Sequence, residues 1–253
     1  MTPKHFFIGG AQRSGTTYTY HLCADHPQIE MAHPVKPEPK FFMNPALVSQ
    51  GLAYYHAQYF GQKADVSLYG EKSTSYIEVE YAAQHIAAHL PDAKFVFILR
   101  NPVERAISNY WFSHKNGFET LPLADAIYGE SARVADFDPR KISVSPYAYL
   151  KRGRYIDYLR MYARYFDRQQ IHVMIYEQVV NNPQAAHDLY AFLGIDTTHV
   201  PATQFQIINA NDDRPHDHLA PPLASYMHDY FRDSNAQLFD YLGYAVDEWA
   251  EPW

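Results

Sequence analysis

The chain has 253 residues and 47% hydrophobic content, which is enough for one sizeable core, so we expect a single domain over residues 1–253. Its net charge of −7 argues against a generally basic surface of the kind that binds nucleic acid or a polyanionic glycan. A local basic pocket is compatible with that charge.

Cysteine content and the N-terminal residues bear on the compartment. Cys23 is the only cysteine, so no intramolecular disulfide can form and no oxidising compartment is needed. Cys23 falls in a helical pattern and is expected to be a small core residue. The N-terminus lacks a cationic stretch followed by a long apolar run, which argues against a signal peptide. The apolar run KFVFIL is too short to cross a membrane, so we expect a soluble, cytoplasmic protein.

The first hundred residues alternate between strand and helix patterns. His5–Gly9 is a short apolar run that ends in glycines, which predicts a buried strand. A helical pattern follows over Thr16–Ala24. Four prolines keep residues 33–45 irregular, so we expect a loop that lines a site. The other elements expected here are helices over 51–60 and 81–90 and a short strand at the start of LYGEKSTSYI.

The clearest strand of the chain is residues 94–99, which read KFVFIL and are apolar on both faces, as in a central parallel strand. Arg100 follows it, and Asn101-Pro102 then supplies an N-cap and a first-turn proline for a helix through Phe112. Residues 119–146 follow no clear pattern, and we expect a mobile or substrate-facing segment there. The remaining expected elements are helices over 154–166, 183–193 and 225–242, a strand over 171–176 and a loop over 206–222. Alternating strands and helices predict an α/β fold with a parallel sheet.

Residues 8–17 read IGGAQRSGTT and connect the first predicted strand to the first predicted helix. The glycines let the backbone turn sharply and expose its N–H groups, and the helix adds the positive end of its dipole. The hydroxyls of Ser14, Thr16 and Thr17 can donate further hydrogen bonds. This segment therefore predicts an anion-binding loop, although the same glycines also suit an ordinary strand-to-helix turn.

The cation of this loop is Arg13, two residues before the last glycine. A nucleoside-triphosphatase loop instead has a lysine directly after that glycine, where this chain has Thr16, and it holds magnesium. The strongest predicted strand is followed by Arg100 rather than by an acidic residue that could help to hold magnesium. Arginines in these places can neutralise phosphate without a metal ion, and the 14 histidines show no spacing typical of a metal site.

A second candidate phosphate segment reads RNPVERAIS at residues 100–108. Arg100 leaves the tip of a strand and Ser108 lies about two turns into the next helix, so both could reach one phosphate. The alternative is an ordinary helix start with surface charges, in which Arg105 only pairs with a carboxylate.

QRSGTT and RNPVERAIS together resemble the two cofactor signatures of the sulfotransferases that use 3′-phosphoadenosine 5′-phosphosulfate (PAPS). The resemblance implies that the first segment binds the 5′-phosphosulfate and the second the 3′-phosphate. It also implies a three-layer, P-loop NTPase-like α/β fold with a central, mostly parallel sheet flanked by helices. The likeness extends over nearly the whole chain. The sequence is most similar to the glycan and heparan sulfate branch, and we expect the protein to be a bacterial member of it. The segments that carry it are KPEPKFF, EKSTSYI, GRYIDYL, IHVMIYEQVVNNPQ, FLGI and NDDRPHDHL.

The resemblance also implies roles for individual residues. Glu38, just before a Phe-Phe pair, would be the general base, and Arg13 and Lys72 would stabilise the transferred group. The residues expected to bind the cofactor are Gln12, Arg13, Ser14, Gly15, Thr16 and Thr17 on the 5′ side, Arg100 and Ser108 at the 3′-phosphate, Tyr155 near the adenine and Arg214 in a closing loop. Read without the resemblance, Glu38 would be an exposed residue paired with Lys36 or Lys40, and Lys72 would form a surface pair with Glu71. A core position is the alternative for Tyr155.

The chain departs from the family pattern at several places. Arg13 stands where the heparan and cytosolic branches usually have lysine, and one cysteine cannot form the heparan branch's disulfide. Asp212 and Asp213 precede Arg214 where that branch has Lys-Gly. Cytosolic aryl and steroid sulfotransferases use a histidine as the base, but no motif places His114 in that role, and it is interpreted as an ordinary helix histidine.

These observations predict transfer of a sulfuryl group from PAPS to a hydroxyl of a carbohydrate or small-molecule acceptor, with 3′,5′-adenosine bisphosphate (PAP) as product and no metal. A P-loop small-molecule kinase is one alternative, and it would need magnesium and the missing lysine. A module that binds adenosine bisphosphate without turnover is another, and it would not need Glu38. The net charge argues against a long sulfated polyanion as acceptor, and a neutral sugar, a lipid-linked sugar and an aromatic metabolite are all compatible with the sequence.

Overall fold

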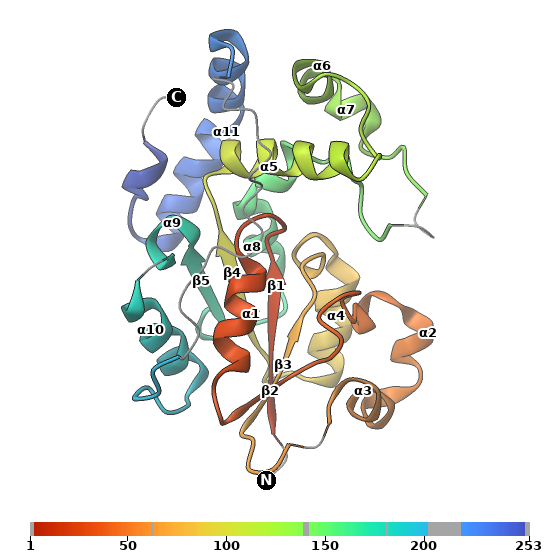
Figure 1. Cartoon of the computed structure of the whole chain (residues 1–253), viewed down its shortest axis with the longest axis vertical. Coiled ribbons are helices and arrows are strands. Elements are labelled where there is room, and N and C mark those ends of the chain that lie inside the picture. The colour runs from red at the N-terminus through yellow and green to blue at the C-terminus, as the bar shows by residue number, and fades with distance from the viewer. Residues whose placement is uncertain (1–2, 62, 139–141, 181, 202–218, 251–253) are drawn as a thin grey trace. The chain divides into compact units, whose positions relative to one another are not determined.

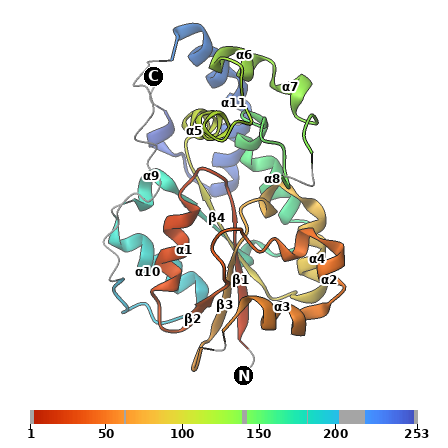
Figure 2. The same cartoon turned by 45° about the vertical axis from the view of Figure 1, so that its right-hand side comes forward.

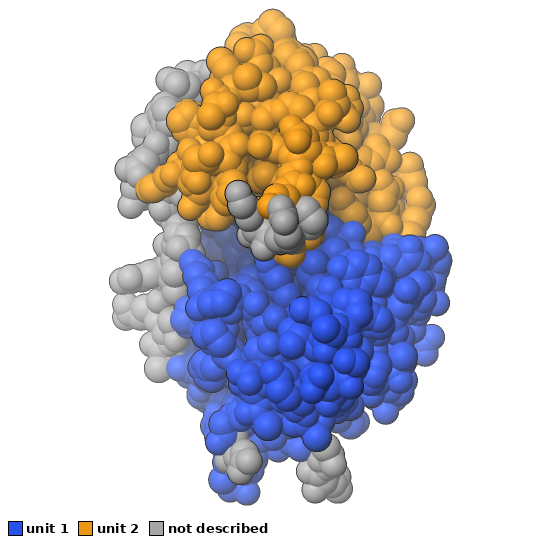
Figure 3. Space-filling model, turned by 90° about the vertical axis from the view of Figure 1, so that its right-hand side faces the viewer, with its two compact units in different colours: residues 1–99, 161–208 blue, residues 100–160, 209–253 orange. Residues whose placement is uncertain are grey.

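The computed structural model of the chain describes residues 3–61, 63–138, 142–180, 182–201 and 219–250. The chain divides into two compact units, which Figure 3 shows in different colours. Unit 1 comprises residues 1–99 and 161–208, and unit 2 comprises residues 100–160 and 209–253. Each unit has its own cluster of buried hydrophobic side chains. The single domain expected from the chain length stays a prediction.

Within the described residues, unit 1 contains a five-stranded parallel sheet with the strand order β2-β3-β1-β4-β5. The strands are β1 (Lys4–Gly10), β2 (Ile29–Met31), β3 (Leu68–Lys72), β4 (Lys94–Leu99) and β5 (Ile171–Ile175). The predicted α/β fold with a central parallel sheet is confirmed. The strand β2 was not predicted from the sequence, because three residues are too few to show a periodic pattern. Its pairing with β3 defines it.

Helices cover both faces of this sheet (Figures 1 and 2). On one face lie α1 (Thr16–Ala24) and α10 (Pro183–Leu193), which share a buried cluster with Val96 and Ile98 of β4. On the other face lie α3 (Gly51–Tyr59) and α4 (Glu80–His89). There Phe95 stacks between Phe7 and Phe97, at centroid distances of 5.5 and 6.0 Å. Alternate residues of β4 are therefore buried on opposite faces, as the apolar run KFVFIL predicts.

Short helices complete unit 1. They are α2 (Pro45–Val48), α9 (Tyr176–Val179) and the 3₁₀ turns at Phe41–Met43, Tyr76–Glu78 and Arg168–Gln170. The predicted strand over 171–176 ends one residue early because α9 begins at Tyr176. The predicted helix over 154–166 is shorter in the structure: α8 (Tyr155–Tyr162) contributes residues to both units and ends at Tyr162.

Unit 2 is helical in its described residues. It contains α5 (Pro102–Lys115), α6 (Leu123–Tyr128), α7 (Glu130–Arg133), α11 (Pro221–Leu242) and 3₁₀ turns at Lys151–Gly153 and Asp247–Trp249. The predicted cap of α5 is confirmed, because the Asn101 side chain accepts hydrogen bonds from the N–H groups of Val103 and Glu104. The buried cluster of this unit includes Val103 of α5, Ile127 of α6 and Met227 of α11.

The structure adds two short helices to unit 2 and moves the start of a third. Residues 119–146 contain α6 and α7, although their sequence shows no clear helical pattern; the two helices have six and four residues, too few for one to emerge. The helix expected over 225–242 begins earlier, at Pro221, so part of the predicted loop over 206–222 is helical. Two prolines fit its first turn because the N–H groups there have no partner within the helix.

Every helix among the described residues is too short or too polar to cross a bilayer. Cys23 lies on α1 with no exposed surface and packs in the buried cluster of unit 1. Burial raises the pKa of its thiol, so the sulfur stays protonated. The expectation that Cys23 is a core residue is confirmed.

One buried contact of β1 makes the stability of the fold depend on pH. The Nε2 atoms of His5 and His56 lie 2.8 Å apart, so one ring donates and the other accepts, and the two rings cannot both be protonated in this contact. Burial, with a smaller contribution from His56, lowers the pKa of His5 from 6.5 to about 4. As the pH falls from about 6.5 to about 4, the unfolded chain binds the proton first. We therefore expect this histidine to lower the free energy of unfolding by about 1.4 kcal/mol per pH unit in that window.

Urea unfolding of the wild-type chain and of His5→Phe between pH 7 and pH 4 measures this effect. The difference in unfolding free energy between the two proteins should shrink as the pH falls, because the variant lacks the titrating ring. A difference that is constant over this range would contradict the prediction.

Candidate functional site

The loop between β1 and α1 starts at the edge where the parallel strands end. The N–H of Ala11 donates to the carbonyl oxygen of Ile98, at 2.8 Å, which fixes the loop to the end of β4. Arg13 and Gly15 have φ angles of 67° and 90°, in the left-handed region. A Cβ at Gly15 would lie 2.7 Å from the ring of Tyr176. The last glycine of QRSGTT is therefore needed for both conformation and space.

Ser14 is the residue of this loop that points most clearly to a ligand. It has no exposed surface, and its Oγ has no hydrogen-bond partner among the described residues. A buried hydroxyl without a partner costs roughly 1–3 kcal/mol. Thr16 is buried and Thr17 half-buried at the first turn of α1, where backbone N–H groups have no partner within the helix. A hydroxyl, a helix N-terminus and the cation of Arg13 fit an anionic group such as a phosphate or phosphosulfate.

Two further segments meet next to this loop within unit 1. The Gln12 side chain donates to Ser75 Oγ at 3.1 Å, and the N–H of Ser73 donates to the carbonyl of Ile8 at 3.2 Å. The N–H of Lys40 donates to Ser73 Oγ at 2.9 Å. The end of β3 therefore joins the glycine-rich loop to the segment that contains Glu38.

Glu38 and Lys72 form the central ion pair of this site. Lys72 Nζ lies 2.6 Å from Glu38 Oε1, and the side chains are only 3% and 14% exposed, respectively. The N–H of Thr74 donates to Oε2 at 2.9 Å, and its hydroxyl lies about equally close to both oxygens, at 3.1 and 3.0 Å. The structure thus brings together two residues that the resemblance assigns to catalysis. Lys72 does not form the surface pair with Glu71 that the sequence also allowed.

The hydrogen bonds of Glu38 leave room for another donor. A carboxylate offers about four lone-pair positions. Lys72 and the N–H of Thr74 each supply one proton, and the Thr74 hydroxyl has only one proton to give, to either oxygen. Counted over the described residues, one position is left for another donor, and 14% of the side chain is exposed. This arrangement suits a general base whose orientation is fixed before the acceptor arrives.

Glu71 is a buried acid beside this pair that the sequence analysis considered only as a surface partner of Lys72. It has no exposed surface, and it accepts hydrogen bonds from the hydroxyls of Tyr55 and Ser73 at 2.6 and 2.5 Å. Burial raises the pKa of its carboxyl above the ordinary value, although these hydrogen bonds oppose the shift. The signal in the sequence was the pattern EKSTSY, in which the acid lies at the end of a strand and hydroxyl and phenol side chains follow.

The residues expected at the 3′-phosphate belong to unit 2. Arg100 Nη2 donates to Glu104 Oε2 at 2.8 Å, one turn along α5, and Ser108 is buried on the same helix. Tyr155 is buried as well, and its hydroxyl donates to the Arg100 carbonyl at 2.7 Å. Arg105 has no exposed surface and donates to the carbonyl of Tyr149. Arg105 therefore lies in the interior of unit 2 and is not a surface charge.

Arg214 and His114 are the remaining residues that the sequence singled out. Arg214 lies outside the described residues. His114 lies on α5 with its ring near those of Tyr110 and Trp111, at centroid distances of 5.9 and 5.8 Å. No cluster of three or more histidine, cysteine, aspartate and glutamate side chains suited to a metal ion occurs in the described part of the chain.

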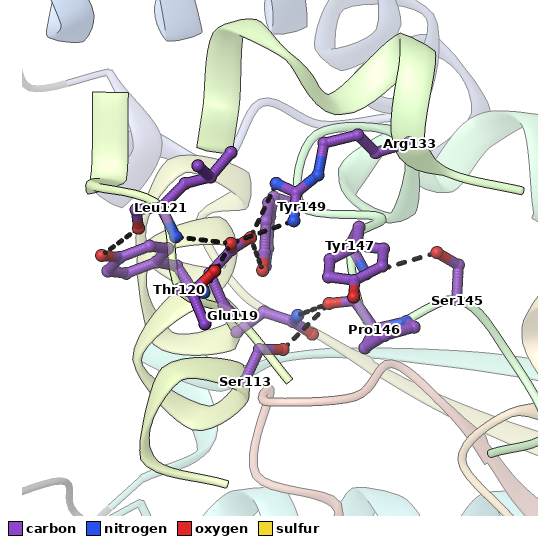
Figure 4. A network of polar contacts seen from close by, with 11 residues as sticks. Ser113, Glu119, Thr120, Leu121, Arg133, Ser145, Pro146, Tyr147 and Tyr149 are labelled. Atoms are coloured by element: carbon purple, nitrogen blue, oxygen red, sulfur yellow. Dashed lines mark hydrogen bonds and ion pairs between the residues drawn. The ribbon is translucent and has the colours of Figure 1, made fainter. Parts of the chain in front are cut away.

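A second buried carboxylate, Glu119, organises unit 2 (Figure 4). Arg133 donates to both of its oxygens, at 2.9 and 3.0 Å, and the Tyr149 hydroxyl donates at 2.8 Å. The N–H groups of Thr120 and Leu121 donate to Oε1 at 2.9 Å each. Burial alone would raise the pKa of Glu119, but these hydrogen bonds hold it below the ordinary value. The segment expected to be mobile or substrate-facing thus begins at a fully hydrogen-bonded acid whose side-chain partners are 14 and 30 residues away.

The chain is similar to known sulfotransferases. Residues 3–219 match a family model described as "Sulfotransferase domain". Over 94% of its length the chain is 24% identical to the membrane-associated sulfotransferase kil1 of Dictyostelium discoideum, of which it covers 65%. It is 25% identical over 93% of its length to the bifunctional heparan sulfate N-deacetylase/N-sulfotransferase 1 of Xenopus laevis, of which it covers 29%. It therefore spans less than two thirds of either relative.

Solved structures agree with this similarity. A sulfotransferase from Alicyclobacillus acidocaldarius superposes with a TM-score of 0.81 and 26% identity, covering 99% of this chain and 100% of that one. The mouse sulfotransferase SULT7A1, solved in complex with PAP, gives a TM-score of 0.56 at 13% identity, covering 92% of this chain and 85% of that one. The second match supports the fold alone.

The geometry of the loop predicts different effects for alanine at two glycines. Gly51 and Gly15 both have positive φ angles, of 79° and 90°, but a Cβ at Gly51 would meet no atom within 4 Å. Gly51→Ala should cost about 1–2 kcal/mol of unfolding free energy, from the backbone conformation. Gly15→Ala should cost a further ~1–3 kcal/mol because the Tyr176 ring must move. Denaturant unfolding of both variants measures this, and equal losses would contradict the tight contact at Gly15.

Proposed function

The chain belongs to the sulfotransferase family, and we propose that it transfers the sulfuryl group of PAPS to a hydroxyl of a carbohydrate or small-molecule acceptor. The observation that carries this proposal is the pair of buried Lys72 and partly exposed Glu38, joined through the end of β3 to the loop that contains Arg13. A base with an open lone pair next to an anion-binding loop has the parts that such a transfer needs.

The residues of the loop fit the donor. PAPS supplies a sulfuryl group activated by its bond to the 5′-phosphate. Ser14 Oγ, the first N–H groups of α1 and the guanidinium of Arg13 would hold the anionic 5′ end, with Gln12, Gly15, Thr16 and Thr17 completing the loop. Arg100 and Ser108 would hold the 3′-phosphate, with Tyr155 near the adenine and Arg214 closing over it.

Glu38 would take the proton of the acceptor hydroxyl while that oxygen bonds to sulfur. The bond between sulfur and the 5′-phosphate oxygen of PAPS breaks in the same transfer, and PAP leaves with the electron pair. The hydrogen bonds from Lys72 and Thr74 fix the carboxylate in one orientation, so little reorganisation is needed when the acceptor binds. Lys72 and Arg13 would offset the negative charge that develops around the transferred group. Arginine holds its proton too tightly to act as an acid, so the role of Arg13 is electrostatic.

Incubation with ³⁵S-labelled PAPS and separate pools of neutral sugars, glycolipids and phenols tests the reaction. We expect label in one pool, with transfer unchanged by EDTA, because arginines and Lys72 supply the positive charge. Activity that EDTA abolishes would contradict the metal-independent mechanism. Absence of transfer to every pool, with PAP still bound, would favour a binding module without turnover.

Thermal unfolding tests the nucleotide. PAP should raise the melting temperature more than ATP does, because only PAP carries the 3′-phosphate assigned to Arg100 and Ser108. Saturation at 100 times the dissociation constant corresponds to about 2.7 kcal/mol of added stability. An equal response to ATP would refute the 3′-phosphate assignment.

Glu38→Gln tests the base. The amide cannot take a proton, so kcat should fall by roughly 10²- to 10⁴-fold, while the dissociation constant for PAP changes less than about twofold. Glu80→Gln, at an exposed position on α4, is the control and should keep the wild-type kcat. Near-normal turnover of Glu38→Gln would place the base elsewhere.

A further inference from the structure

Residues at the end of β3 form hydrogen bonds to two carboxylates, those of Glu38 and Glu71. Lys72 and Thr74 bind the carboxylate of Glu38. Glu71 and Ser73, which alternate with them, bond to each other on the other side. Four consecutive residues therefore link a partly exposed acid to a fully buried one.

Glu71 is surrounded by hydroxyl groups. Tyr55 Oη lies 2.6 Å from its Oε2, and Ser73 Oγ lies 2.5 Å from its Oε1. The hydroxyl of Tyr76 also hydrogen-bonds to it. A buried carboxylate is tolerated only when its lone pairs are used in this way.

Two of these hydroxyls also accept hydrogen bonds from the backbone of the segment that follows Glu38. Ser73 Oγ accepts the N–H of Lys40 at 2.9 Å, and Tyr76 Oη accepts the N–H of Phe42 at 3.0 Å. Lys40 has a φ of 49°, a conformation that a residue with a side chain disfavours. The segment is therefore held in place by contacts and not by its own preference.

The direction of these hydrogen bonds depends on the charge of Glu71. Each hydroxyl has one proton, and an ionised carboxylate can only accept. The hydroxyls of Ser73 and Tyr76 therefore point their protons at Glu71 and their lone pairs at the backbone N–H groups of Lys40 and Phe42. An amide in place of the carboxylate would present N–H protons to at least one hydroxyl and disturb this order.

We propose that Glu71 is a positioning residue that holds the Glu38 segment for catalysis, acting through Ser73 and Tyr76 on the backbone of Lys40 and Phe42. This role rests on the proposed function of Glu38 as the base. Burial raises the pKa of Glu71, and the negative charge of Glu38 adds to that shift. The two carboxylates are therefore close enough to interact electrostatically. Glu71 itself has no exposed surface, so the proposed role requires no contact with a substrate.

Glu71→Gln tests the role. We expect kcat to fall by roughly 10- to 100-fold while the dissociation constant for PAP stays within about twofold, because the anion-binding loop keeps its contacts. Glu30→Gln is the matched control. Glu30 is a buried acid on the neighbouring strand β2, and it accepts the N–H groups of Gly61 and Lys63 at 2.5 and 3.0 Å. It should keep the wild-type kcat.

A double-mutant cycle separates positioning from general damage. If Glu71 acts through Glu38, Glu71→Gln should cause less than about a twofold further loss in the Glu38→Gln background. Two losses that multiply fully would overturn the positioning role. Ser73→Ala, which removes one of the two links, serves as the second variant should Glu71→Gln fail to fold, and it should show the same pattern.

Amide hydrogen exchange gives a readout that does not depend on turnover. In Glu71→Gln the amides of Lys40 and Phe42 should exchange at least about tenfold faster, while the amide of Phe95 in β4 should not change. Unchanged exchange at both positions would overturn the proposal. Absence of transfer by the wild-type chain would refute the proposed function and this role together, whereas wild-type transfer with undiminished kcat in Glu71→Gln would refute this role alone.

Discussion

The ion pair between Lys72 and Glu38 is the contact on which the candidate site depends. It exists because parallel strands end at one edge of a sheet: β3 ends at Lys72, and β1, its neighbour, leads into the loop with Arg13. The segment with Glu38 belongs to neither strand, and it reaches this edge through its bonds to Ser73 and Thr74. The sheet thus sets the place of the cations, and the hydrogen bonds at the end of β3 set the place of the base.

Stability alone does not account for so many charges in the interior. Desolvation of a buried pair such as Lys72–Glu38 costs several kcal/mol per ion, and well-packed apolar residues of similar size are often as stable or more stable. Glu71 has the same cost, and its hydrogen-bond partners among the described residues are hydroxyl groups and not a cation. Ser14 adds a buried hydroxyl without a partner in the described residues. A cost that recurs at neighbouring positions, next to one loop, is typical of a site shaped for a ligand and a reaction.

Local patterns in the sequence predicted the local parts of the structure. The glycine-rich loop, the strand KFVFIL and the Asn101-Pro102 cap each depend on a few consecutive residues, and each is found as expected. The strand β2 and the helices α6 and α7 are too short for periodicity, and their positions follow from packing. The buried acids Glu71 and Glu119 could not be recognised, because their partners include residues 16 and 30 positions away in the chain. The roles of Glu38 and Lys72 came from family resemblance, since the residues alone favoured ordinary surface pairs.

The register of one strand pair connects the fold to the chemistry. Ile8 of β1 lies opposite Lys72 of β3, so β3 ends two residues before β1 does. Side chains alternate along a strand, so a slip of one residue would exchange the faces of Lys72 and Glu71, and Glu71 would then lie toward Glu38. Two carboxylates would then face each other without the cation between them, which is strongly unfavourable in an interior of low dielectric constant. The register that brings Lys72 to Glu38 is also the one that buries Leu68 of β3, so the sheet and the site stabilise one arrangement.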